Sequence, residues 1–178
     1  MTEARPDERR APFESCPKGR GAAMVVMQWN EKMSVGVPEI DGDHRQLIRV
    51  INQLGANYDD DTRRDSLRQS LIALRRYAEF HFAREEKVMT ACGYPGLDAH
   101  RQEHRNFVGR IQELNKLFDE GPERSAEVVN DALLIFLKDW LNHHILIEDK
   151  AYQPFVQNNR EARETAKSFK AAEIWWTS

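Results

Sequence analysis

The chain has 178 residues with a formal net charge of -3 at pH 7, which is long enough for one domain with a buried core. Acidic and basic residues are interspersed, so the charge pattern favours neither nucleic acid nor an anionic membrane as a partner. Two cysteines, Cys16 and Cys92, are too few for a disulfide framework or a thiolate zinc site. The apolar run at 22–27 is too short for a signal peptide core or a membrane span. We therefore expect a cytoplasmic protein.

Residues 1–23 are rich in charged and polar side chains. They cannot bury enough apolar surface to fold, so we predict a disordered extension. A folded domain is predicted over residues 24–156. It opens with an extended arm, residues 25–43, that packs along the domain. The arm ends in Asp41-Gly42-Asp43, which is typical of a helix N-cap region.

Four amphipathic helices are predicted next, over residues 43–58, 64–91, 96–119 and 123–152. In the second and third helices, the apolar positions recur at alternating spacings of three and four residues, which is typical of four-helix bundles. Short loops require neighbouring helices to run in opposite directions. We therefore predict an all-α fold, an up-and-down antiparallel four-helix bundle.

The predicted core face of the fourth helix comprises Val129, Leu133, Phe136, Trp140, His144, Ile147 and Ala151. Pro154 is expected to end this helix because proline cannot continue the helical hydrogen bonding. Residues 157–178 form a C-terminal tail, in which a short amphipathic helix is predicted over 160–176. Trp175 and Trp176 near its end suggest docking, either onto the bundle or onto a partner protein.

Five of the six histidines lie on the predicted core faces. Residues four apart share one face of a helix, so His81 pairs with Glu85 and His100 pairs with His104. In an antiparallel bundle, these four residues come to the same height as His44 and His144. A single core histidine is usually satisfied by a protein partner, but six polar groups in one layer would each cost roughly 1–3 kcal/mol if left unsatisfied. The pattern therefore indicates a buried metal centre.

The fourth helix leaves two alternatives for a further carboxylate. Glu148 lies four residues after His144 and so shares its face, whereas Asp149 lies five residues on, about 140° round an ideal helix. Asp149 would reach the layer only by extending sideways or through a π-bulge, so helix geometry alone slightly favours Glu148. Five histidines and two carboxylates exceed what one ion usually accepts. They suit two ions with bridging carboxylates, and they favour iron.

Several motifs together resemble the hemerythrin family in its bacterial single-domain form. The match covers roughly residues 29–155, and its motifs are highly specific. They are Ser34-Val35-Gly36-Val37 followed by Ile40-Asp41 and His44, then His81-x-x-x-Glu85, Gly93-Tyr94-Pro95, His100-x-x-x-His104, and Trp140-Leu141-x-x-His144-Ile145-x-x-x-Asp149-x-x-Tyr152.

The resemblance implies a non-haem centre of two iron ions, joined by an oxo or hydroxo group, that binds O2 reversibly. One ion would be held by His100, His104 and His144. The other would be held by His44 and His81 and would keep one position open. Glu85 and Asp149 would bridge the two ions. The family pattern thus favours Asp149 over Glu148, and it predicts a π-type irregularity between His144 and Asp149.

From their adjacency to these ligands, we expect Phe82, Trp140, Leu141 and Ile145 to line an apolar O2 pocket. The leading hypothesis is a binding protein that carries, stores, delivers or senses O2, rather than an enzyme. The alternatives are a di-iron redox enzyme, a scavenger of nitric oxide or peroxide, and, as a weaker option, iron storage or a zinc site.

Overall fold

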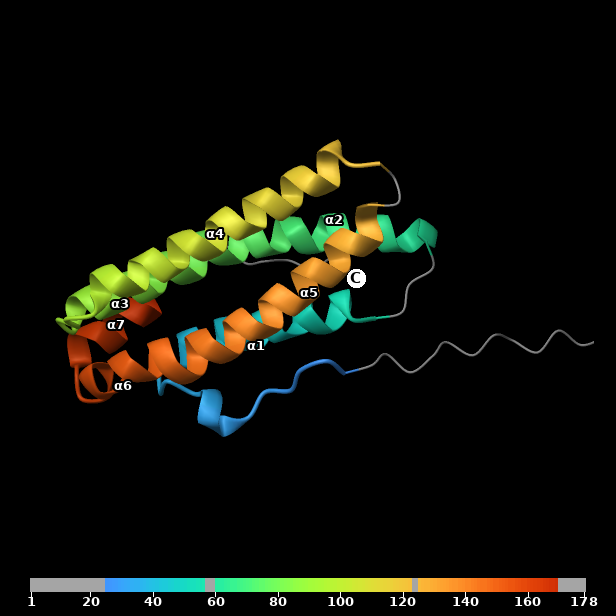
Figure 1. Ribbon diagram of the computed structural model, residues 1–178. Coiled ribbons are helices and arrows are strands. Elements are labelled where there is room, and N and C mark those ends of the chain that lie inside the picture. Colours follow the sequence, from blue (N-terminus) through green and yellow to red (C-terminus); the bar gives the residue numbers. More distant parts are fainter. Residues whose placement is uncertain (1–24, 57–59, 123–124, 170–178) are drawn as a thin grey trace, which may run out of the picture.

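The computed structural model describes residues 25–56, 60–122 and 125–169 (Figure 1). All the regular elements in this part of the chain are helical. In chain order they are η1 (Glu31–Met33), α1 (Pro38–Leu54), α2 (Asp60–Tyr77), η2 (Ala78–Phe82), α3 (Ala83–Ala91), α4 (Leu97–Glu120), α5 (Ser125–His143), η3 (His144–Asp149), α6 (Lys150–Gln157) and α7 (Arg160–Ser168). The segments η2 and η3 are π-helical turns that join α-helices without a break.

Four long helical runs form the bundle, which confirms the predicted fold class. The runs are α1, then α2–η2–α3, then α4, and then α5–η3–α6, and they lie side by side in Figure 1. Aliphatic and aromatic side chains fill the core because they recur at helical spacing and face inward. No helix in the described ranges is long and apolar enough to cross a membrane.

The apolar core consists of two clusters. The larger cluster includes Leu47, Phe82, Phe107 and Leu141. The smaller one, near the turn between α3 and α4, includes Ile40, Val88, Tyr152 and Ala166. On each of the four helical runs, the predicted site residues come between members of the two clusters. The core is therefore interrupted by one polar layer.

The arm before α1 packs on the domain, as predicted. The backbone N–H groups of Val26 and Met27 donate to the side-chain oxygen of Asn52, at 2.8 and 2.9 Å. At Gly55, just after α1, a Cβ atom would lie 2.1 Å from a Val26 methyl carbon. A glycine there lets the arm approach closely and favours an end to the helix. This explains why α1 ends at Leu54, earlier than predicted.

The predicted helix start at Asp41-Gly42-Asp43 is wrong, since α1 begins at Pro38. The fixed φ of proline suits the first helical turn, where its missing N–H costs nothing. Asp41 lies inside the helix and accepts hydrogen bonds from the Ser34 hydroxyl, at 2.6 Å, and from the Val35 N–H, at 2.8 Å. It therefore ties the arm to α1 rather than capping the helix.

The π-turn η3 confirms the irregularity predicted between His144 and Asp149. It also corrects the predicted core face, because Ile147 is 56% exposed and Ala151 is exposed as well. A π-turn accommodates one extra residue, so the positions after it rotate relative to an unbroken α-helix. As a result Asp149 and Tyr152 point into the core instead.

The C-terminal part also differs from prediction. Pro154 does not end the fourth helical run, because α6 continues through it to Gln157, held by the fully buried Tyr152 and Val156. The predicted tail helix begins at Arg160 as expected, but it ends at Ser168. Trp175 and Trp176 lie outside the described residues, and so does the predicted extension, residues 1–23.

Candidate metal centre

The structure brings all seven predicted ligand residues together in the polar layer. They come from every run of the bundle: His44 from α1, His81 from η2, Glu85 from α3, His100 and His104 from α4, and His144 and Asp149 from η3. Each of these residues is at most 2% exposed. Seven ionisable groups are thus buried together in one layer of the core.

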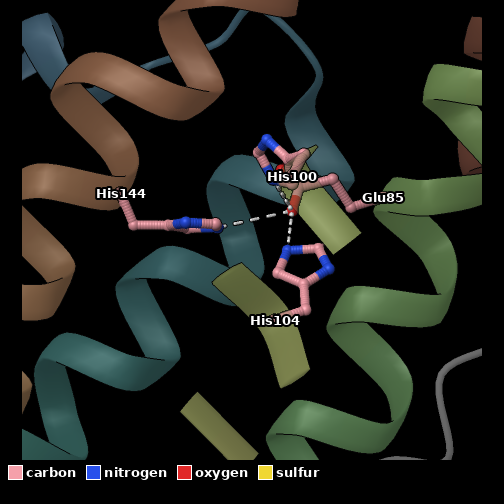
Figure 2. Close-up of side chains that lie close together, drawn as sticks. All are labelled: Glu85, His100, His104 and His144. Atoms are coloured by element: carbon pink, nitrogen blue, oxygen red, sulfur yellow. Dashed lines mark hydrogen bonds and ion pairs between the residues drawn. The ribbon is translucent and has the colours of Figure 1, made fainter. Parts of the chain in front are cut away.

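Glu85 lies at the centre of two ligand groups. One group is Glu85 with His100, His104 and His144, and the other is Glu85 with His44 and His81. Within each group, one donor atom per residue lies within 4.8 Å of all the others. Figure 2 shows the three histidines of the first group pointing at one oxygen of Glu85. Their Nε2 atoms lie 3.4, 3.1 and 3.7 Å from Oε2, for His100, His104 and His144 respectively.

Asp149 joins the two groups a second time. Its Oδ1 lies 3.2 Å from Nε2 of His144 and 3.5 Å from Nε2 of His100. Its Oδ2 lies 3.2 Å from Nε2 of His44. Both carboxylates therefore touch both histidine groups, which is the arrangement that two bridged metal ions require.

Helix geometry alone favoured Glu148, and the structure shows the reverse. Glu148 is partly exposed and pairs at 3.4 Å with His143, which is itself 57% exposed. This pair lies outside the polar layer. Asp149 reaches the layer because η3 brings residues five apart onto one face of the helix.

Several atoms that face the interior of the layer lack a hydrogen-bond partner. Among the described residues, Nε2 of His44, His81 and His144 and both oxygens of Asp149 accept or donate no hydrogen bond. Leaving so many buried polar atoms unsatisfied would be strongly destabilising. Neutral imidazoles and carboxylates are also the usual ligands of divalent transition metals. The residues present therefore fit a binuclear metal site.

The pKa directions indicate a place for positive charge. Burial lowers the pKa of His44, His81 and His144, so their imidazoles stay neutral, which is the form that binds metal. Burial and the charge of Glu85 raise the pKa of Asp149 to about 8. Burial would lower the pKa of His104, but hydrogen bonds to Glu85 and Glu86 outweigh it and raise that pKa to about 9. Without a metal ion, Asp149 and His104 therefore favour their protonated forms at neutral pH.

Carboxylates and a phenol outside the seven residues hold some of them in place. Nδ1 of His81 lies 3.2 Å from Asp43, and Nδ1 of His104 lies 2.9 Å from Glu86. The Tyr152 hydroxyl donates to Glu85 at 2.6 Å. Bonds of this kind turn the opposite nitrogen, Nε2, toward a metal.

Sequence reasoning missed these supporting roles. Each supporting residue lies on a different helical run from the ligand it supports, so helical periodicity does not relate the two. The sequence did offer one signal, the Asp-x-x-Tyr spacing of Asp149 and Tyr152. A tyrosine buried near carboxylates usually needs a hydrogen-bond partner, which here is Glu85.

Aromatic rings stack on three of the histidines. Phe82 lies over His104 with 3.8 Å between ring centroids, and Trp140 lies over His144 at 4.1 Å. Tyr77, which the sequence analysis did not single out, stacks on His81 at 4.7 Å. Leu141 and Ile145 are fully buried. These contacts exclude water from one side of the layer and limit rotation of the imidazoles.

Comparison with known proteins gives a consistent result. The family model described as "Hemerythrin HHE cation binding domain" matches residues 35–156. The chain is 30% identical over 128 residues to a bacteriohemerythrin of Clostridium acetobutylicum, covering 70% of this chain and 96% of that protein. It is 32% identical over 143 residues to a bacteriohemerythrin of Stenotrophomonas maltophilia, covering 79% of this chain and 90% of that protein.

A solved structure is also similar. The crystal structure of a wild-type hemerythrin superposes with a TM-score of 0.57 at 28% sequence identity. The superposition covers 74% of this chain and 98% of the other. The similarity therefore extends through the whole helical bundle of that protein.

Proposed function

The chain belongs to the hemerythrin family, and on that premise we propose that it binds O2 reversibly at a centre of two iron ions in the polar layer. The observation that carries the proposal is that Glu85 and Asp149 each contact both histidine groups. Two shared carboxylates are suited to holding two ions close together. The curated relatives, which are named bacteriohemerythrins, support the same conclusion.

The ligands divide unequally between the two positions. His100, His104 and His144 would hold one ion, and His44 and His81 would hold the other, with Glu85 and Asp149 bridging them. The second ion would thus receive one histidine fewer. With four protein ligands against five, the side of His44 and His81 would leave more room for a small ligand.

Five imidazoles with only two carboxylates favour iron among the metals that bind nitrogen and oxygen donors in helical bundles. Two iron ions would donate electrons to O2 when it binds and accept them back when it is released. The protein must then hold the ligands still and keep water out. The stacked rings of Phe82 and Trp140 and the buried side chains of Leu141 and Ile145 would do so.

The residues around the layer also control protons. The Tyr152 hydroxyl is committed to Glu85, and burial with the charge of Glu85 raises its pKa well above the ordinary value, so it keeps its proton. Asp43 and Glu86 accept from the outer nitrogens of two histidines. Tyr152, His81 and His104 thus have their protons held by fixed partners, which suits binding without cleavage of O2. Carrying, storage, delivery and sensing all use this chemistry.

The proposal is tested by the stoichiometry of O2 uptake. The metal-free chain is loaded anaerobically with Fe²⁺, freed of excess metal, and titrated with O2 while dissolved O2 is followed with an electrode. We expect two iron ions per chain and one O2 taken up per pair of ions. A chain that binds only one ion, or that takes up no O2 when two ions are bound, would contradict the proposal.

A further inference from the structure

Arg84 on α3 is a buried arginine, 5% exposed, that joins three parts of the chain. Its Nη1 forms an ion pair with Asp43 of α1. The same nitrogen donates to the Glu39 carbonyl at 3.4 Å, and Nη2 donates to the Phe169 carbonyl at 3.3 Å. A guanidinium presents several donors in a fixed plane, so it can hold such partners at set positions relative to one another.

The segment that ends at Phe169 lies along α3 (Figure 1). At its start, the Asn159 side chain donates to the Ala91 carbonyl at the end of α3, at 3.4 Å. In its middle, Ala162 and Ala166 are fully buried in the smaller core cluster. At its end, the Phe169 ring lies over Arg84, with 5.6 Å from the guanidinium carbon to the ring centroid.

This segment, residues 160–169, lies beyond residues 35–156, which the family model matches. Its contacts with α3 are nevertheless extensive, because its two buried alanines allow the backbones to approach closely. The segment therefore lies outside the matched part of the domain, and it ends beside Arg84.

Asp43 carries the connection from Arg84 into the metal layer. One of its oxygens, Oδ2, is shared by Arg84 and by Nδ1 of His81, which lies 3.2 Å away. On the other edge of the ring, Nε2 of His81 lies 3.6 Å from Glu85. An outer carboxylate of this kind selects the histidine tautomer that leaves Nε2 free for a metal.

We propose that Arg84 is a positioning residue that couples the docked segment 160–169 to His81 through Asp43, so that docking of the segment raises the affinity for the metal ion held by His44 and His81. This inference rests on the proposed function, because it takes His81 as a ligand. His104 has a similar support in Glu86 and Arg101, but Arg101 is 37% exposed and pairs within α3 and α4. The coupling therefore acts on one ion of the two.

The test uses the full-length chain and two variants that break the connection at different points. Arg84→Gln removes the cation beside Asp43. Ala166→Asp places a charge in the buried contact with α3 and undocks the segment while leaving Arg84 in place. The matched controls are Arg76→Gln, at an exposed arginine two turns earlier on the same helical run, and Ser168→Asp, which adds the same charge at an exposed position of α7.

The first readout needs no metal. Nitrogen NMR of metal-free protein labelled in its histidines reports which ring nitrogen of His81 carries the proton when the imidazole is neutral. We expect the Nδ1–H tautomer in the wild-type chain and in both controls, and a mixture of tautomers in Arg84→Gln and Ala166→Asp. Arg84→Lys keeps a cation near Asp43 and is expected to retain the wild-type tautomer. It also provides a second variant at this position if Arg84→Gln does not fold.

The second readout is anaerobic titration with Fe²⁺ against a chromogenic chelator. We expect the weaker of two binding steps to lose about 10- to 100-fold in affinity in Arg84→Gln and Ala166→Asp, the range typical for outer partners of metal ligands, and the other step to stay unchanged. Two ions bound by every variant, with no change in tautomer or affinity, would overturn the coupling and leave the proposed function standing. A wild-type chain that does not bind a second ion would overturn the proposed function, and the coupling with it.

Discussion

The hydroxyl of Tyr152 donates a 2.6 Å hydrogen bond to Oε1 of Glu85, while the other oxygen of the same carboxylate faces four histidines. Burial alone would raise the pKa of Glu85, but His81 and the hydrogen-bonded histidines hold it well below its ordinary value, so the acceptor is charged. A buried hydrogen bond to a charged group contributes more than a neutral one. Tyr152 thus fixes one end of the carboxylate that links the two ligand groups.

Tyr152→Phe removes that bond without changing the shape of the core. We expect the free energy of unfolding of the metal-free protein to fall by about 2 kcal/mol, because the Glu85 carboxylate loses a buried donor. Urea unfolding followed by circular dichroism measures it. Tyr94→Phe makes the same change at a half-buried tyrosine and serves as the control. Equal effects in both variants would show that the bond to Glu85 contributes little.

His81→Ala tests the division of ligands between two ions. We expect the iron content to fall from two ions per chain to one, because the group of His44 and His81 would be left with a single histidine, while His100, His104 and His144 stay intact. Metal analysis after desalting measures this number. His143→Ala, at the exposed neighbour of His144, should retain two ions. A His81→Ala chain that still holds two ions would refute the assignment.

Asp149→Asn tests which acidic residue of η3 serves the site. An amide cannot supply two anionic oxygens to two cations, so the affinity for the second ion should fall at least about tenfold, the lower end of what even outer partners cost. Glu148→Gln should leave it unchanged, since Glu148 pairs with His143 near the surface. Competition with a chelator gives both affinities. A larger loss of affinity in Glu148→Gln than in Asp149→Asn would instead identify Glu148 as the ligand, as simple helix geometry favoured.

Periodicity was sufficient to predict the bundle and most of the ligand layer. The alternating spacings that place Leu74 and Val88 in the core also place His81 and Glu85 there, and all four are buried. Periodicity held across the π-turn η2 but failed at the π-turn η3. It assigned Ile147 and Ala151 to the core, although the π-turn η3 rotates them outward and turns Asp149 inward. Only the family pattern of the motif predicted that irregularity.

The supporting contacts could not be predicted from one chain's pattern. Asp43 of α1 contacts His81 of η2, and Arg84 donates to the carbonyl of Phe169, which lies 85 residues further along the chain. No local spacing relates such residues, because their proximity follows from how the helices pack. The bonds that Asp41 accepts from the arm are a further contact of this kind. Local propensity thus predicted the elements, and tertiary packing determined their ends and their polar partners.

The most direct measurement is an oxygenation cycle on the full-length chain. Protein carrying two Fe²⁺ ions is exposed to O2, its visible spectrum is recorded, and the O2 is then removed under vacuum. We predict a coloured species that persists in air, disappears under vacuum, and returns unchanged over repeated cycles. An immediate ferric product that vacuum does not reverse would contradict reversible O2 binding and would favour a redox enzyme or a scavenger.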